Sequence, residues 1–146
     1  ALAKQQLSGA KKDFYLGVLA FQAKQWNESV SFLTQAVTAN PDLSDYIYLY
    51  RGQANMALGE SQKALDDFKK AEQSSRLKFI ADVSHFYEAE IYQGLKQWKK
   101  SEPIYKKLQK RLARSKYYPA VLWGSLSAQM ASKGNSRFVC RNAKEL

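Results

Sequence analysis

The chain of 146 residues is poor in the residues that build catalytic and metal sites. It contains a single cysteine, Cys140, and a single histidine, His85. One cysteine excludes an internal disulfide framework, and the two residues together are too few for a tetrahedral zinc set or a Ser-His-Asp or Cys-His arrangement. Glycine-rich phosphate loops are also absent. We therefore expect no enzymatic activity, no catalytic residue, no metal and no cofactor, with His85 and Cys140 as structural residues.

Long hydrophobic runs are missing as well. No apolar stretch approaches the roughly 20 residues that a membrane-spanning helix needs, and residues 1–12 hold three lysines without the apolar centre of a signal peptide. The chain is nevertheless 45% hydrophobic and 13% aromatic, which is enough for a packed core and disfavours disorder. A single cysteine fits both reducing and oxidising compartments, so the localisation stays open.

Acidic residues are scarce in the last third of the chain. Residues 1–95 hold 10 Lys/Arg and 11 Asp/Glu, whereas residues 96–146 hold 13 Lys/Arg against Glu102 and Glu145 alone. The net charge of +10 therefore arises entirely from the second of these segments. Such an asymmetry concerns the partners of a protein and not its fold.

Part of this charge is predicted to form an exposed basic face. Ile104, Tyr105, Leu108 and Leu112 recur at helical spacing and mark the buried stripe of one helix. The cations around this stripe define the basic face: Lys99, Lys100, Lys106, Lys107, Lys110, Arg111 and Arg114. The face fits an acidic protein, an anionic polymer or a membrane surface, or it is a solvated helix face without a partner. No common nucleic-acid motif accompanies the charge, which disfavours nucleic acid as a partner.

Internal repetition is the most informative feature that the sequence does have. Gly17, Gly52, Ala89 and Gly124 follow one another at intervals of 35, 37 and 35 residues. Leu33, Phe68, Tyr105 and Cys140 each lie 16 positions later, with the same intervals. A period near 35 with two helices per unit is typical of a helical solenoid. A small residue lets two helices approach closely, so we expect the small and large residues to meet where the helices of one hairpin cross.

The apolar spacing predicts eight helices in four hairpins. Six of them span 13–24, 26–39, 45–58, 61–74, 79–94 and 98–114; another starts near Pro119, and the last ends at Leu146. Pro41 ends the second helix, because a proline moves the residue before it out of the helical region. Gly59 suits the position just after a helix end, and Ser61 is a candidate cap of the next helix.

The repeated positions resemble the tetratricopeptide repeat (TPR) family. The first repeat matches the family pattern best, through Leu16, Gly17, Trp26, Ser29, Leu33, Ala36 and Pro41. The resemblance implies an all-α fold, a right-handed α-solenoid of about four TPR-like helical hairpins. It implies one domain over 1–146, with repeats at about 10–43, 45–78, 82–116 and 117–146, the last incomplete. Because the array stops without a polar capping helix, we expect the chain to be part of a longer protein.

The resemblance also implies a function, because TPR proteins bind partner segments in a concave groove lined by the first helix of each repeat. The matching positions form an aromatic, mostly uncharged peptide-binding groove: Phe14, Val18, Phe21, Tyr46, Leu49, Tyr50, Gln53, Phe86, Tyr87 and Glu90, continued by Val121 and Ser125. We expect this groove to hold a peptide or helix of another protein, with Tyr and Phe as anchors. Packing between neighbouring helices is the competing role for the same aromatics.

One specialised TPR function is disfavoured. Some members hold the carboxylate of a chaperone C-terminus with Lys, Asn or Arg side chains. The matching positions here are Phe14, Val18, Tyr50, Val83 and Tyr87, and none of them carries a charged donor.

Two further functions stay open beside the interaction scaffold. Some bacterial cell-wall lytic enzymes carry a non-catalytic helical superhelix ahead of their catalytic domain, and the chain would suit such a role in a larger enzyme. Alternatively, the basic C-terminal half would make it an electrostatic adaptor for an anionic surface. A domain following Leu146 would indicate the first of these, and strong salt dependence of binding would indicate the second.

Overall fold

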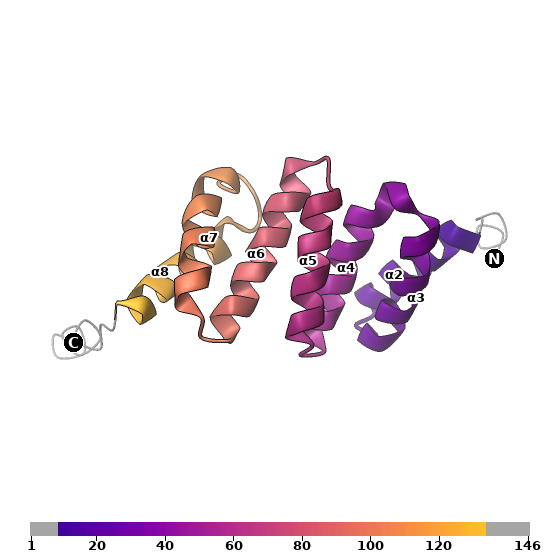
Figure 1. The fold of residues 1–146 in the computed structure, drawn as a ribbon, viewed down its shortest axis with the longest axis horizontal. Coiled ribbons are helices and arrows are strands. Elements are labelled where there is room, and N and C mark those ends of the chain that lie inside the picture. Colours follow the sequence, from indigo (N-terminus) through magenta and orange to yellow (C-terminus); the bar gives the residue numbers. More distant parts are fainter. Residues whose placement is uncertain (1–8, 134–146) are drawn as a thin grey trace. The chain divides into compact units, whose positions relative to one another are not determined.

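The computed structural model describes residues 9–133, which form helices joined by short connections (Figure 1). Within this range the elements are α2 (Gly9–Gln22), α3 (Trp26–Ala39), the short 3-10 helix η1 (Pro41–Leu43), α4 (Ser44–Ala57), α5 (Ser61–Ser74), α6 (Lys78–Gly94), α7 (Trp98–Arg111) and α8 (Tyr118–Ser132). The prediction of an all-α protein is confirmed for this part of the chain. None of these helices combines the length and the apolarity that crossing a bilayer requires.

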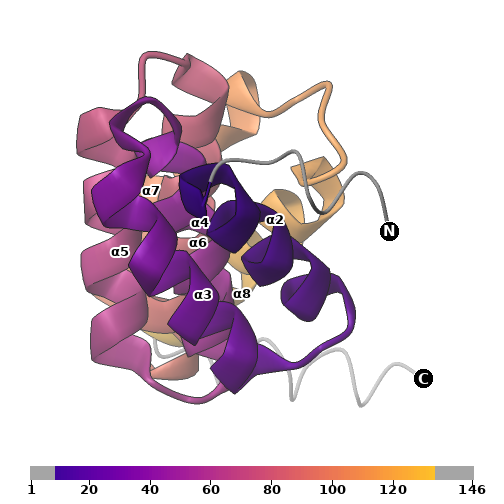
Figure 2. The ribbon, with the colours of Figure 1, turned by 90° about the vertical axis from the view of Figure 1, so that its right-hand side faces the viewer.

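The described residues belong to two compact units, and the boundary between them along the chain falls within α6, after Tyr87. In the first unit, α2 packs against α3, α3 against α4, and α4 against α5, so consecutive helices are neighbours in space (Figure 2). In the second unit, α7 packs against α8. The single domain over 1–146 and its repeat boundaries stay a prediction.

Most predicted helix boundaries agree with the structure. Helices α3 and α5 have the predicted ends, α4 is displaced by one residue, and α6 begins one residue early. Helix α2 begins four residues before its predicted start, at Gly9. Helix α7 ends at Arg111, so the prediction that it continues to Arg114 is wrong. The chain turns there because the Ser115 amide and hydroxyl both donate hydrogen bonds to the carbonyl of Leu112. The predicted last helix, with Cys140, lies outside the described residues.

The three described hairpin turns share one backbone geometry. Their central residues, Lys24, Gly59 and Lys96, adopt positive φ angles of 59°, 77° and 58°. In the first turn, the amide of Gln25 donates to the carbonyl of Ala20, and the amide of Lys24 donates to that of Phe21. The same pair of bonds closes the other two turns, which is the Schellman pattern of helix termination.

Gly59 therefore follows a helix end, as predicted. Ser61 is not a cap: Glu60 holds the cap position without a side-chain hydrogen bond, and Ser61 is the first residue of α5.

Close helix crossings in the first unit explain two of the repeated small residues. A Cβ atom on Gly17 would lie 2.7 Å from Cγ of Leu33, and one on Gly52 would lie 2.7 Å from Cε1 of Phe68. The hydroxyl of Ser29 also donates a buried hydrogen bond of 2.9 Å to the carbonyl oxygen of Gly17. The expected contact between small and large residues of one hairpin is thus confirmed for the first two repeats.

Gly124 makes a different contact from the one its place in the repeat predicts. A Cβ atom there would overlap the ring of Tyr105, which belongs to the preceding helix, α7. Gly124 thus permits the packing of α8 on the hairpin before it. Its predicted partner at position 140 lies outside the described residues.

Candidate functional site

In the first unit, helices α2 and α4 hold several predicted groove residues next to one another. The ring of Phe21 meets Trp26 edge to face at a centroid distance of 5.3 Å. It meets Tyr50 in the same way at 5.2 Å. Phe14 and Tyr50 both pack against the buried cluster of Leu33, Ala36 and Ile47. These contacts fix the aromatic side chains of α2 and α4 relative to each other.

The predicted groove residues differ in their exposure to solvent. Tyr46 is 37% exposed, whereas Leu49 and Phe86 are only 7% and 5% exposed. The half-buried members are Phe14, Val18, Phe21, Tyr50, Gln53, Tyr87 and Glu90, and the added residues Val121 and Ser125 are buried. Buried side chains cannot be contacted without a rearrangement, so Leu49, Phe86, Val121 and Ser125 do not belong to the candidate contact set.

Three members of the predicted groove also have partners within their own unit. Tyr87 stacks on Phe68, with ring centroids 5.3 Å apart and planes 13° from parallel. The amide of Gln53 donates to the carbonyl of Leu49 at 3.3 Å. In the second unit, Glu90 accepts a hydrogen bond of 2.5 Å from the hydroxyl of Tyr105. Burial, and then this hydrogen bond, raise the pKa of Tyr105 well above its ordinary value.

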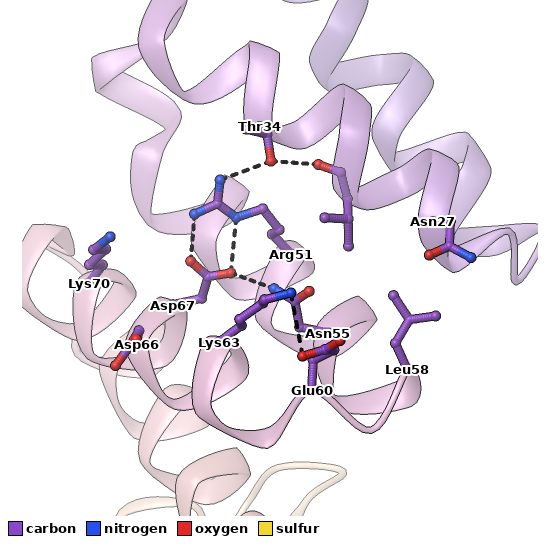
Figure 3. A pocket seen from close by; sticks show the side chains of 11 residues that line it. Asn27, Thr34, Arg51, Asn55, Leu58, Glu60, Lys63, Asp66, Asp67 and Lys70 are labelled. Atoms are coloured by element: carbon purple, nitrogen blue, oxygen red, sulfur yellow. Dashed lines mark hydrogen bonds and ion pairs between the residues drawn. The ribbon is translucent and has the colours of Figure 1, made fainter.

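A polar network that the sequence analysis missed connects α3, α4 and α5. Arg51 binds both carboxylate oxygens of Asp67, with Nε–Oδ2 and Nη2–Oδ1 distances of 2.9 Å and 2.6 Å (Figure 3). Its third nitrogen donates to the hydroxyl of Thr34 at 3.1 Å, and Asn55 donates to Asp67 at 3.0 Å. The hydrogen bond to Asp67 raises the pKa of the Arg51 guanidinium.

The network borders a cavity of about 330 Å³ between these three helices. Three basic and three acidic residues line it: Arg51, Lys63, Lys70, Glu60, Asp66 and Asp67. Their formal charges balance, and four of the six are paired with one another, Arg51 with Asp67 and Lys63 with Glu60. We interpret the network as a structural link between helices.

A sequence signal for this network exists in retrospect. Arg51 precedes Asp67 by 16 residues, the interval that also separates Gly52 from Phe68. Asp67 is also a charged residue on a helix face that is otherwise buried and apolar, beside Ala64, Phe68 and Ala71. A buried carboxylate needs a partner, and the repeat interval indicates where to look for it.

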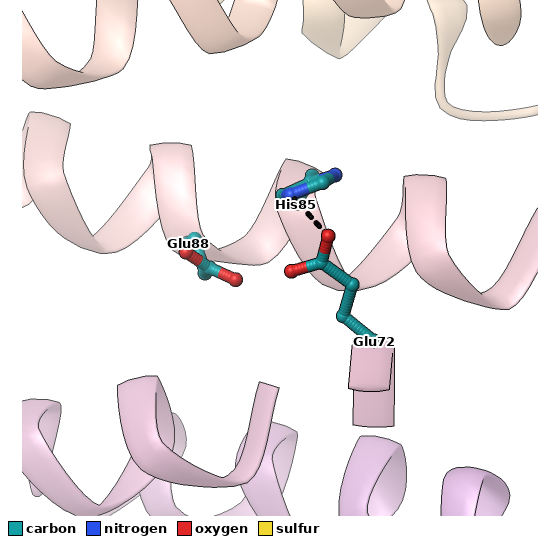
Figure 4. A group of neighbouring side chains, drawn as sticks. All are labelled: Glu72, His85 and Glu88. Atoms are coloured by element: carbon teal, nitrogen blue, oxygen red, sulfur yellow. Dashed lines mark ion pairs between the residues drawn. The ribbon is translucent and has the colours of Figure 1, made fainter. Parts of the chain in front are cut away.

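His85 is held in a local ion pair. Its Nε2 lies 3.1 Å from Oε1 of Glu72, and both side chains are partly exposed (Figure 4). Glu88 follows one turn later on α6 and is buried. The contact to Glu72 fits the structural role that we expect for this histidine.

The basic face lies on α7 and just beyond it. All seven predicted residues are exposed. Six of them lie on α7, and Arg114 lies in the turn that follows. Ser101, Tyr105 and Leu108 form the buried side of the helix, and Leu112 just beyond it is buried as well, as predicted. Ile104 is half-buried.

Several solved structures have a similar fold, and two TPR domains are among them. The match to the TPR domain of Arabidopsis OM64 has a TM-score of 0.69 at 19% sequence identity, and covers 81% of this chain and 94% of that one. The match to the TPR2B domain of yeast Sti1, solved as a complex with pHsp70, has a TM-score of 0.71 at 15% identity, and covers 83% and 96%. No protein-family profile and no curated protein matches the sequence.

At these identities the matches show the fold. The chain has the fold of a TPR domain, which confirms the predicted TPR-like helical hairpins. This fold typically serves protein–protein interaction and is usually non-catalytic.

Proposed function

We propose that the chain is an interaction scaffold that binds a peptide or helix of a partner protein on the aromatic surface of α2 and α4. The observation that carries this proposal is the edge-to-face contact of Phe21 with Tyr50, which joins half-buried aromatic rings from the two helices. Rings that are already fixed lose little conformational freedom on binding, and aromatic side chains are frequent anchors of interfaces.

The spacing of the side chains supports a linear partner. Phe14, Val18 and Phe21 recur at intervals of four and three residues along α2, and Tyr46, Tyr50 and Gln53 do the same along α4. Residues at these intervals lie on one face of a helix. Each helix therefore presents a row of side chains, and the two rows suit the regularly spaced anchors of a bound segment.

The chemistry of these rows suits an apolar partner segment. The Sti1 domain was solved in complex with pHsp70. In this chain, the positions that would hold a terminal carboxylate in a TPR clamp are Phe14, Val18, Tyr50, Val83 and Tyr87, all without a charge. We therefore propose recognition by apolar and aromatic contacts, with Gln53 as a polar neighbour.

A peptide-display selection on the whole chain would test this function. The selected peptides would be measured by fluorescence anisotropy against the wild type, a Tyr46→Ala variant and a Phe79→Ala control. Tyr46 and Phe79 are both exposed aromatics, at 37% and 52%, but Phe79 is not among the proposed contact residues.

We expect Tyr46→Ala to weaken binding by about tenfold or more, and Phe79→Ala to leave it within about twofold. Binding should also persist in salt that screens surface charges. Equal affinities of the two variants, or the absence of any selected peptide, would contradict the proposal.

A further inference from the structure

Six cations on α7 form two rows along the helix. Residues seven and four positions apart lie almost above one another, since a turn takes 3.6 residues. Lys99, Lys106 and Lys110 follow this spacing and form the first row. The second row, Lys100, Lys107 and Arg111, is offset by one residue, or about 100° around the helix axis. Each row extends over about 16 Å.

Both rows lie away from the protein interior. All six cations are exposed, whereas Ser101, Tyr105 and Leu108 on the opposite side are buried. Pro103 is exposed between the rows, four residues after Lys99 and four before Lys107. The two rows therefore frame one continuous strip of surface.

A single acidic side chain on α7 stands against the six cations of this strip, and it lies three residues after Lys99 and four before Lys106. The one acidic residue between positions 96 and 116 is Glu102. Its carboxylate accepts a 2.9 Å hydrogen bond from the hydroxyl of Ser132 on α8. The ion pairs in residues 9–133 include those of Arg51 with Asp67, Lys63 with Glu60 and His85 with Glu72, and none of these three involves α7.

Like charges four residues apart repel one another on a helix. Lys106 and Lys110 form such a pair. A bound anionic partner would relieve this repulsion.

The composition of the strip narrows the chemistry of the partner. Helices that bind membrane surfaces usually carry large apolar side chains to insert beside their cations, and proteins that bind single-stranded nucleic acid stack bases on aromatic rings. On α7 the exposed residues are the six cations and Pro103, and its two aromatic side chains, Trp98 and Tyr105, are half-buried and buried, so the strip itself shows neither feature. The large exposed apolar side chains of the same unit lie outside α7: Leu95, Leu122, Trp123, Leu126 and Met130.

We propose that the two basic rows of α7 bind an acidic segment of a partner protein, in which Asp or Glu recurs at helical spacing. The compact charge of a lysine suits a single carboxylate, and carboxylates at the same intervals would face both rows at once. This surface is independent of the aromatic surface on α2 and α4, and the inference does not rest on the proposed function.

The experiment compares two variants of the whole chain that lose the same charge. One carries Lys106→Gln, Lys107→Gln and Lys110→Gln; the other carries Lys11→Gln, Lys12→Gln and Lys69→Gln, three exposed lysines of α2 and α5. Glutamine has a helix propensity close to that of lysine, so both variants should keep their helices, which circular dichroism would verify. The probe is a fluorescent helical peptide with glutamates every three to four residues, and a matched peptide with glutamines is its control.

We expect the wild type to bind the glutamate peptide and not the glutamine peptide. The α7 variant should bind it at least about tenfold more weakly, and the control variant within about twofold of the wild type. Equal losses in the two variants would overturn the inference, because only net charge would then matter. Tighter binding to phosphatidylserine vesicles or to duplex DNA than to the peptide, in the same buffer, would also overturn it.

Discussion

Arg51 holds both carboxylate oxygens of Asp67, at 2.9 Å and 2.6 Å, and so joins helix α4 to helix α5. The side chains are only 14% and 4% exposed. The third guanidinium nitrogen reaches Thr34 on α3, so a single arginine of α4 joins three consecutive helices. Removing one member of such a buried ion pair destabilises the folded protein, because the remaining charge would stay buried without its partner.

Removing one member of this pair should therefore destabilise the protein strongly. We expect Asp67→Ala to lower the free energy of unfolding by about 3–5 kcal/mol, measured by urea denaturation. Asp66→Ala is the matched control, because the neighbouring Asp66 is exposed; its effect should stay within about 0.5 kcal/mol. Similar losses for the two variants would show that the ion pair is not the cause.

The glycines at the close helix crossings should not tolerate a methyl group. We expect Gly52→Ala to cost about 1–3 kcal/mol, because its Cβ would overlap the ring of Phe68. Gly94 is the control: nothing lies within 4 Å of a Cβ placed there, so Gly94→Ala should be neutral or stabilising by up to about 1 kcal/mol. Thermal unfolding of both variants would measure the difference. A stable Gly52→Ala protein would mean that Phe68 can move aside.

The hairpin turns offer a stabilising substitution. Lys24 and Lys96 adopt the left-handed backbone conformation that glycine accepts without strain. Lys24→Gly and Lys96→Gly should each raise the free energy of unfolding by about 0.5–1 kcal/mol. This value is the relief of backbone strain minus the entropic cost of glycine, which has more freedom in the unfolded chain. Lys69→Gly, in the middle of α5, should lower it by about 1 kcal/mol. Denaturation midpoints of the three variants test this, and the same sign for all three would refute it.

The hydroxyl of Tyr105 should make stability fall at alkaline pH. Its pKa is raised in the folded protein by burial and by the hydrogen bond to Glu90, whereas an unfolded tyrosine loses its proton near pH 10. The stabilisation that follows from this raised pKa is fully present below the pKa of the unfolded tyrosine. At higher pH the stabilisation declines, because the tyrosine of the unfolded state loses its proton before that of the folded state. The decline should approach about 1.4 kcal/mol per pH unit.

A matched pair of variants isolates this effect in denaturation experiments between about pH 8 and pH 11. The upper limit lies about one unit above the ordinary pKa of tyrosine. Tyr105→Phe should lose the steep part of the decline, whereas Tyr15→Phe, at an exposed tyrosine, should follow the wild type. Parallel pH profiles for all three proteins would contradict the assignment.

Much of the fold could be predicted because it depends on local and repeated patterns. The ends of α3 and α5 follow from apolar spacing together with the breaks at Pro41 and Gly59, all of which act over a few residues. The contact of Gly17 with Leu33 follows from the repeat, because equivalent residues take equivalent places in each hairpin. The end of α7 was missed because the hydrogen bonds of Ser115 close a turn that no proline or glycine marks.

The candidate site was harder to predict. Position in the repeat assigned Leu49 and Phe86 to the groove together with Tyr46, although only Tyr46 is exposed. Exposure depends on which neighbouring helix covers a side chain, and a family pattern does not contain that information. The network of Arg51 and Asp67 was missed for the same reason, since its members meet only after the helices have packed.

The sequence alone determined the helical hairpins, the places where they turn, and the segregation of positive charge after residue 95. These properties come from periodicity, from glycine and proline, and from composition, which act along the chain. Only the tertiary structure decided that Gly124 contacts Tyr105 of the preceding hairpin, that Asp67 pairs with Arg51, and that Glu102 faces Ser132 on α8. Each of these contacts joins different helices, and its geometry is set by how the helices pack against one another.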